Sequence, residues 1–107
     1  MRLDITSSLQ TSHDVGAYAE SRLRSAFAAF AEQVESVKVS VSHTGDHDET
    51  PIKCRIKVRI HPSGIWLILE TRGADPYAAI DRGVDGIQKS FMRWLARASS
   101  RAVPVAV

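Results

Sequence analysis

The segment IKCRIKVRI, Ile52–Ile60, decides how this chain folds. Apolar and cationic residues alternate through it without interruption. Successive side chains of a β-strand point to opposite faces of a sheet, so one face here is apolar and the other is basic. The apolar set is Ile52, Cys54, Ile56, Val58 and Ile60, and the cationic set, called the strand row below, is Lys53, Arg55, Lys57 and Arg59. The alternation predicts a strand that closes a core on one side only.

A hairpin follows this strand. The segment HPSG, His61–Gly64, places proline and glycine where a tight turn needs them. IWLILETR, residues 65–72, then returns as a strand, and its apolar run predicts a central position or burial on both faces. We expect Trp66 to lie in the core, although an exposed tryptophan there could also stack on a nucleobase.

Two further strands and a helix precede the hairpin. RLDITS, residues 2–7, and SVKVSVSH, residues 36–43, alternate apolar and polar residues and predict strands. Between them, apolar residues recur at spacings of three and four, which is typical of a helix with one buried face. These positions are Val15, Ala19, Leu23, Phe27, Phe30 and Val34.

DPYAAIDRGVDGIQKSFMRWLAR, residues 75–97, predicts a second and longer helix. Asp75 suits the N-cap and Pro76 suits the first helical position. One apolar stripe runs along it, formed by Tyr77, Ile80, Val84, Ile87, Phe91, Trp94 and Leu95. The remaining residues, 99–107, lack periodicity, and we expect a flexible tail after a single domain of residues 1–98.

The predicted order is therefore strand, helix, three strands, helix. Two helices with one apolar face each can cover one face of a four-stranded sheet. The expected fold is α+β, a two-layer sandwich with both helices on one face of the sheet. The other face is left to solvent or to a partner, and 107 residues suit one such domain.

Composition excludes several classes of protein. Cys54 is the only cysteine, so no internal disulfide can form, and no apolar run has the length of a membrane span or the form of a signal peptide. These features favour the cytoplasm. We find no nucleophile motif and no phosphate-binding glycine loop, so we expect no enzyme, catalytic residue, cofactor or small-molecule substrate.

One polar loop contains candidate metal ligands, which are His43, Asp46, His47, Asp48 and Glu49. His61 or Cys54 could complete a site with them. However, the loop lacks ligand spacing and strand parity points Cys54 into the core. We therefore predict a solvated acidic loop and no metal site.

The second helix carries a line of cations opposite its apolar stripe. Arg82, Lys89, Arg93 and Arg97, called the basic stripe below, fall within an arc of roughly 80°. Arg101 follows, and no acidic residue occurs after Asp85. The helix macrodipole alone favours acids at the start and bases at the end. The macrodipole does not require cations at four-residue spacing. Ordinary exposed helices usually place acids between such cations, because the resulting ion pairs stabilise the helix. A row of cations without acids therefore favours a phosphate backbone as partner.

The strand row strengthens this hypothesis. Cations on an edge strand can simply discourage aggregation, but one or two lysines would suffice for that. Four cations on one face repel one another unless acids such as Asp4 and Glu70, or a polyanion, offset them.

Together these residues resemble the ribosome hibernation promoting factors, also called the ribosome-associated inhibitor or sigma-54 modulation family. Its members open the last helix with an acidic residue, a hydrophobic residue and Tyr-x-Ala-Ile-Asp/Asn. Asp75, Tyr77, Ala79, Ile80 and Asp81 match that pattern, and the resemblance covers residues 1–98. It implies a fold like that of double-stranded-RNA-binding domains. It also implies a bacterial stress-response protein that occupies the decoding channel of the small ribosomal subunit and silences translation.

By position, the residues expected to contact ribosomal RNA are Lys89, Arg93 and Arg97. The chain departs from the family at Gly86, where relatives commonly carry lysine, and at Met92 and Trp94, which make the helix more apolar. It resembles the short form of the family, which has no C-terminal dimerisation domain. Two other functions remain open. One is a double-stranded-RNA binder outside the ribosome. The other is a protein-interaction module, which the apolar ending AVPVAV would suit.

Overall fold

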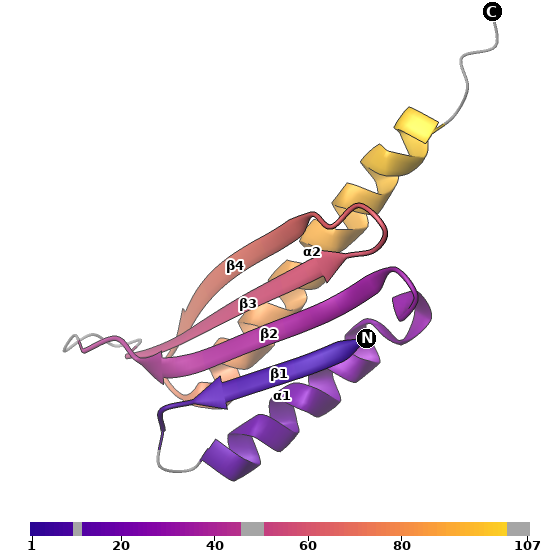
Figure 1. The fold of residues 1–107 in the computed structure, drawn as a ribbon. Coiled ribbons are helices and arrows are strands. Elements are labelled where there is room, and N and C mark those ends of the chain that lie inside the picture. Colours follow the sequence, from indigo (N-terminus) through magenta and orange to yellow (C-terminus); the bar gives the residue numbers. More distant parts are fainter. Residues whose placement is uncertain (10–11, 46–50, 103–107) are drawn as a thin grey trace, which may run out of the picture.

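A computed structural model describes residues 1–9, 12–45 and 51–102, which form a four-stranded sheet and two main helices (Figure 1). The strands are β1 (Arg2–Ser7), β2 (Val34–His43), β3 (Ile52–Ile60) and β4 (Trp66–Gly73). The helices are α1 (Ser12–Ala26), a short 3-10 helix η1 (Ala28–Phe30) and α2 (Pro76–Ala102). This α+β fold confirms the architecture predicted from the sequence.

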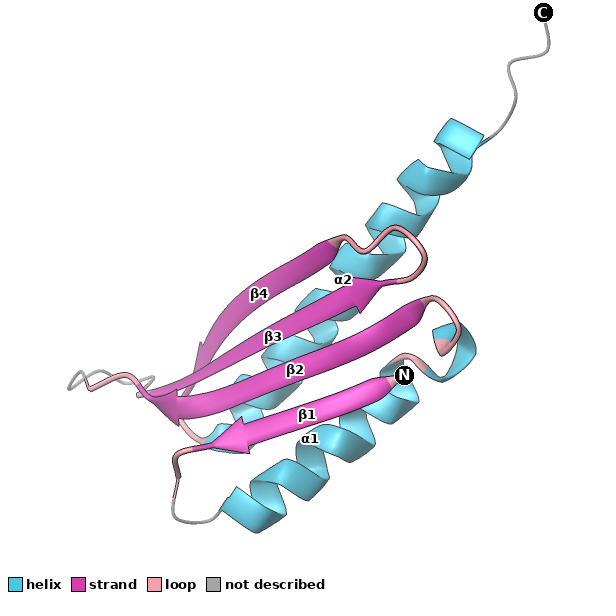
Figure 2. Ribbon diagram, viewed as in Figure 1, coloured by secondary structure: helices cyan, strands magenta, loops and turns pink. Residues whose placement is uncertain are grey.

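The strands lie in the order β1-β2-β3-β4, with β1 parallel to β2 and the other pairs antiparallel. Parallel neighbours need a long connection, and α1 supplies it between β1 and β2. Both helices cover the same face of the sheet (Figure 2). Along that face, α1 contacts β1, whereas α2 contacts β3 and β4. The opposite face, called the open face below, carries no described helix.

The strand order corrects the expected place of the returning strand. β4 lies at an edge of the sheet, not at its centre, and Ile68 on the open face is 53% exposed. An apolar run was therefore misleading, because Leu67 and Leu69 pack towards the core while Ile68 does not.

The core fills the space between the sheet and the helices. Strand alternation and helical periodicity together select its members, as predicted. They include Val15, Ala19, Leu23 and Phe27 of the α1 segment, Val37, Val39 and Val41 of β2, Ile52, Cys54, Ile56, Val58 and Ile60 of β3, and Ala79, Ile80, Val84, Ile87 and Phe91 of α2. Phe91 meets Phe27 and Phe30 edge to face, each with ring centroids 5.3 Å apart. This cluster closes the end of the core.

The first helix ends earlier than its periodicity predicts. α1 stops at Ala26, Phe30 lies in η1, and Val34 opens β2 opposite Ile60. Pairing with β3 competes with helix formation for Val34, and no glycine or proline marks the change in the sequence. Local periodicity could not reveal it, because the deciding contact is with a distant strand.

The second helix begins and ends at clear positions. Its N-cap is Asp75, whose Oδ1 accepts a hydrogen bond from the amide of Ala78 at 2.9 Å. α2 then runs to Ala102, so residues 99–102 of the predicted tail are helical, and residues 103–107 lie outside the described part. No helix in the described ranges is long and apolar enough to cross a membrane.

Candidate nucleic-acid interface

The acidic residues of α2 bind the other helix. Asp81 accepts hydrogen bonds from the Tyr18 hydroxyl at 2.5 Å and from Arg22 Nε at 3.0 Å, and Asp85 pairs with Arg22 Nη2 at 3.3 Å. The hydrogen bond to Asp81 raises the pKa of Tyr18. Both carboxylates are therefore engaged with α1, away from the cations in the second half of their own helix.

Tyr77 lies beside this network. The predicted apolar stripe includes it, yet it is 40% exposed and meets Tyr18 edge to face at 5.0 Å. Its ring thus extends the contact between the two helices at the surface. The contact between the Tyr77 and Tyr18 rings gives Tyr77, a residue of the hibernation-factor pattern, a packing role.

Three cations of the basic stripe point to solvent. Lys89, Arg93 and Arg97 are exposed, and none of them forms a salt bridge with any described residue. Arg93 donates a hydrogen bond to the hydroxyl of Ser90 at 3.2 Å, which is on the same helix. Since the acids of α2 are occupied by Arg22, the charge of this half of the helix is uncompensated.

Arg82, the first cation of the basic stripe, has a different environment. Its Nη1 donates a hydrogen bond to the carbonyl of Arg72 on β4 at 2.9 Å. β4 is an edge strand, so this bond satisfies one of its free backbone groups. Arg101 lies in the last turn of α2, and its side chain is outside the described part of the structure.

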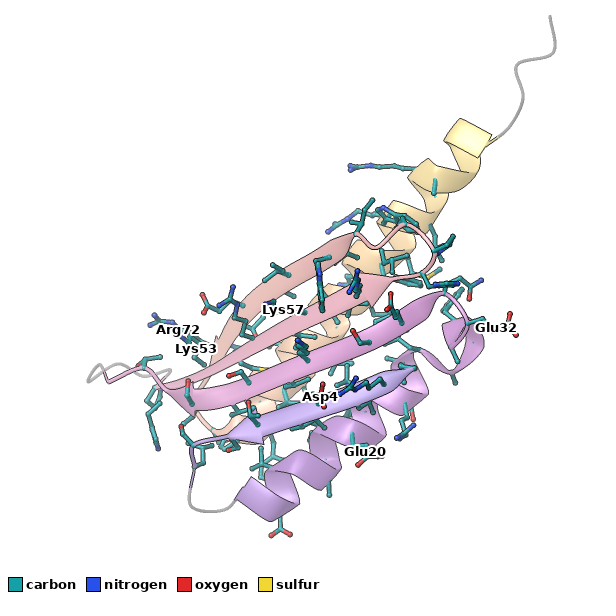
Figure 3. The ribbon with its side chains drawn as sticks, viewed as in Figure 1. Asp4, Glu20, Glu32, Lys53, Lys57 and Arg72 are labelled. Atoms are coloured by element: carbon teal, nitrogen blue, oxygen red, sulfur yellow. The ribbon has the colours of Figure 1, made fainter. Side chains whose placement is uncertain are left out.

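The open face carries the strand row. Lys53 pairs with Glu70 at 3.4 Å and Arg59 pairs with Glu35 at 3.5 Å, whereas Arg55 and Lys57 have no salt bridge among the described residues. Figure 3 shows Lys53 and Lys57 on this face of the sheet. The acids therefore offset only part of the row. The row and the basic stripe lie on different layers of the molecule, and the contact between Arg72 and Arg82 lies at the edge that both layers share.

Sequence reasoning missed Lys38 and misplaced Trp66. Lys38 of β2 lies opposite Lys57 of β3 in the strand register, and Trp66 of β4 lies opposite Arg59 of β3. The indole lies within reach of all three cations, with Lys38 Nζ and Lys57 Nζ each 5.5 Å and Arg59 Cζ 5.7 Å from the ring centroid. Trp66 is thus half-buried among cations on the open face, not in the core. Lys38 occupies a polar position in the alternating segment SVKVSVSH, and this position could have predicted that it lies on the open face.

Cys54 has no role in this surface. It is fully buried, and burial raises the pKa of its thiol to about 12. The described residues contain no cluster of three metal-ligating side chains. Of the candidate loop, Asp46, His47, Asp48 and Glu49 lie outside the described residues.

Several solved structures share this fold, and two of them illustrate the match. The N-terminal domain of Protein Y from Thermus thermophilus is 26% identical, with a TM-score of 0.60, and the match covers 87% of this chain and 94% of that one. A ribosomal subunit interface protein from Coxiella burnetii is 11% identical, with a TM-score of 0.67, over 90% of this chain and 99% of that one. The resemblance to the hibernation-factor family is confirmed. No family model matches the sequence, and no curated protein matches it either.

Gly86, where the chain departs from the hibernation-factor pattern, faces Leu69 of β4. A Cβ atom at Gly86 would collide with Cδ2 of Leu69 on β4. One turn earlier, a Cβ at Gly83 would lie 2.9 Å from Ile56 Cδ1 and 3.2 Å from Thr71 Oγ1. The two glycines allow α2 to approach the sheet closely. Gly86 therefore lies against β4 at a position inside the arc of the basic stripe.

Proposed function

We propose that this chain is a ribosome-associated translation inhibitor that binds RNA of the small subunit and blocks the decoding channel by occupying it. The observation that supports it most is the uncompensated set Lys89, Arg93 and Arg97 on α2. One structure of the same fold is a ribosomal subunit interface protein, which supports a ribosomal partner. The mechanism is steric, and it requires no catalytic step, cofactor or small-molecule substrate. A ribosomal partner also implies a cytoplasmic location for this protein.

The charge arrangement suits binding to a phosphate backbone. Each cation that neutralises a phosphate releases a condensed counterion, which makes binding favourable and strongly dependent on salt. The end of α2 projects beyond the sheet (Figure 1). Arg97, which follows the last core contacts at Trp94 and Leu95, can therefore enter a groove that the body of the domain cannot. Because the guanidinium and ammonium groups of Lys89, Arg93 and Arg97 are not held by described carboxylates, binding breaks no internal ion pair.

Co-sedimentation with small ribosomal subunits over a salt series tests this function. Replacing Lys89, Arg93 and Arg97 together by glutamate should abolish sedimentation. Single replacements should each reduce the slope of log affinity against log salt by about 0.7–0.9. The expected reason is the loss of one phosphate contact per replaced cation.

Arg24→Glu is a matched control, because Arg24 is also an exposed helical arginine but pairs with Glu20 on α1 at 2.9 Å. It should leave the salt slope unchanged. If the triple variant still sediments with the small subunit at moderate salt, these residues do not form the interface. Equal affinity for a plain RNA duplex and for the subunit would instead favour a double-stranded-RNA binder outside the ribosome.

A further inference from the structure

The open face of the sheet combines an aromatic ring with cations from three strands. Trp66 lies on β4, Lys38 on β2, and Lys57 and Arg59 on β3. All three cationic groups lie within 5.7 Å of the indole centroid. Ile68, two residues along β4 on the same face, is 53% exposed. An aromatic and an aliphatic side chain at the surface, surrounded by positive charge, form an amphipathic platform.

The charges of this platform are only partly balanced within the described chain. Lys38 and Lys57 face each other across neighbouring strands, an arrangement that normally destabilises a sheet. Asp4 lies opposite Lys38 across β1 and β2, and its carboxylate is 3.8 Å from Arg2 Nε. Glu35 pairs with Arg59 at 3.5 Å. No described carboxylate forms a salt bridge with Lys38 or Lys57. The positive charge of the pair is therefore only partly offset within the described chain, which favours an anionic partner.

A shallow hollow on the same face shares Lys38 and Lys57 with the surroundings of the ring, although the ring itself does not line it. Its volume is about 420 Å³, and residues of β1, β2 and β3 line it. Lys38, Arg55 and Lys57 contribute cations, Thr6 and Ser40 contribute hydroxyls, and the Asp4 carboxylate and Val39 complete the lining. Hydroxyl and cationic donors side by side suit the oxygens of a phosphate or a ribose.

We propose that the open face binds single-stranded RNA, with Trp66 stacking on one unpaired base and Lys38 and Lys57 contacting the adjoining phosphates. An unpaired base offers the planar face that stacks on an indole, whereas the bases of a duplex are already stacked on each other. No described helix covers this face of the sheet (Figure 2), which leaves it accessible to a strand laid across it. This site lies on the layer opposite to α2. It extends the proposed function, on which the choice of RNA as polyanion rests.

The test is a titration with a labelled single-stranded uridine oligonucleotide, followed by fluorescence anisotropy. Trp66→Ala should weaken binding roughly tenfold, and Trp66→Phe should restore most of it because a phenyl ring still stacks. Lys38→Gln and Lys57→Gln should each weaken binding and lower its salt dependence. The RNA duplex of the same length should bind less tightly and should not distinguish Trp66→Ala from the wild type.

Intrinsic fluorescence supplies an independent readout. The chain has two tryptophans, so in Trp94→Phe all of the tryptophan emission comes from Trp66. The uridine oligonucleotide should quench it as binding saturates. Trp94→Phe itself should bind the oligonucleotide with wild-type affinity, which makes it the matched control for loss of an indole elsewhere.

Unchanged affinity in Trp66→Ala, or unquenched emission in Trp94→Phe at saturation, would overturn the site. Equal quenching by a polyglutamate peptide would also overturn it, since the face would then accept any polyanion or an acidic protein. The assay uses free RNA, so it separates the two proposals. A chain that fails to sediment with ribosomes but shows Trp66 quenching loses the proposed function and retains this site.

Discussion

Cys54 shows how strand alternation sets the chemistry of a single side chain. Its position in IKCRIKVRI directs the thiol into the core, where its exposure is 0%. Burial disfavours the thiolate and raises the thiol pKa from 9.0 to about 12. In the folded protein Cys54 therefore acts as a small apolar residue.

The raised pKa of Cys54 predicts that the free energy of unfolding falls at alkaline pH because of this one residue. The folded pKa is raised, so the stability that it contributes is present below pH 9 and is lost as pH rises towards 12. Between those limits, the free energy of unfolding of the wild type should fall relative to Cys54→Ala by about 1.4 kcal/mol per pH unit. Urea unfolding of both proteins from pH 8 upwards measures the difference. Titration of lysines and tyrosines affects both proteins alike, and parallel curves would contradict the buried thiol.

At the scale of elements, the contact between α2 and the sheet depends on small residues. A Cβ at Gly83 would meet Ile56, Thr71 and Cys54, each at 3.3 Å or less. Ile56 is fully buried, so moving it would also displace its close-packed neighbours. The hydroxyl of Thr71 also donates a hydrogen bond to the carbonyl of Ala79 at 2.9 Å, which holds the strand and helix together.

Alanine substitutions at two helical glycines should therefore act in opposite directions. Gly83→Ala should lower the free energy of unfolding by about 1–2 kcal/mol, because overpacking exceeds the gain in helix propensity. Gly16→Ala on α1 should raise it by up to about 1 kcal/mol, since the nearest atom to its Cβ is Ile5 Cγ2 at 4.0 Å. Chemical denaturation of the two variants provides the comparison. A stabilised Gly83→Ala protein would show that the helix can move away from the sheet at little cost.

The sequence predicts elements well where the signal is local. The parity of β3 and the cap at Asp75 depend on neighbouring residues, and the structure reproduces both. The edge position of β4 and the early end of α1 depend on which strands pair, and no local pattern contains that information. The same distinction applies to the candidate interface. Lys89 and Arg93 follow from helix spacing, whereas the location of Trp66 beside Lys38 needs the order of three strands.

At the scale of the molecule, acidic and basic side chains occupy different places. The acids Asp81 and Asp85 join α2 to α1, and cations remain exposed on the second half of α2 and on the open face. This separation costs stability where like charges meet, as at Lys38 and Lys57. Surfaces that bind polyanions commonly accept such a cost.

Charge reversal on the open face should change stability and binding in opposite directions. In Lys57→Glu, the new carboxylate would face Lys38 across the strands and lie between Arg55 and Arg59 along β3. The free energy of unfolding should rise by up to about 1 kcal/mol, while affinity for single-stranded RNA falls. Thermal unfolding and the anisotropy titration measure the two effects. Lys57→Gln should give a smaller change in both, and lower stability in Lys57→Glu would contradict repulsion at this position.

The projecting end of α2 has a consequence for how the protein recognises a partner. Among the described side chains, Trp94 and Leu95 are the last to pack against the core, so the helix beyond them depends on its own hydrogen bonds. Amides in such a segment exchange their hydrogens at free energies well below that of global unfolding. A partner that binds Arg97 therefore also secures the last turns of the helix. Part of its binding energy is used to order them, and slowed hydrogen exchange in this segment would be a direct mark of the bound state.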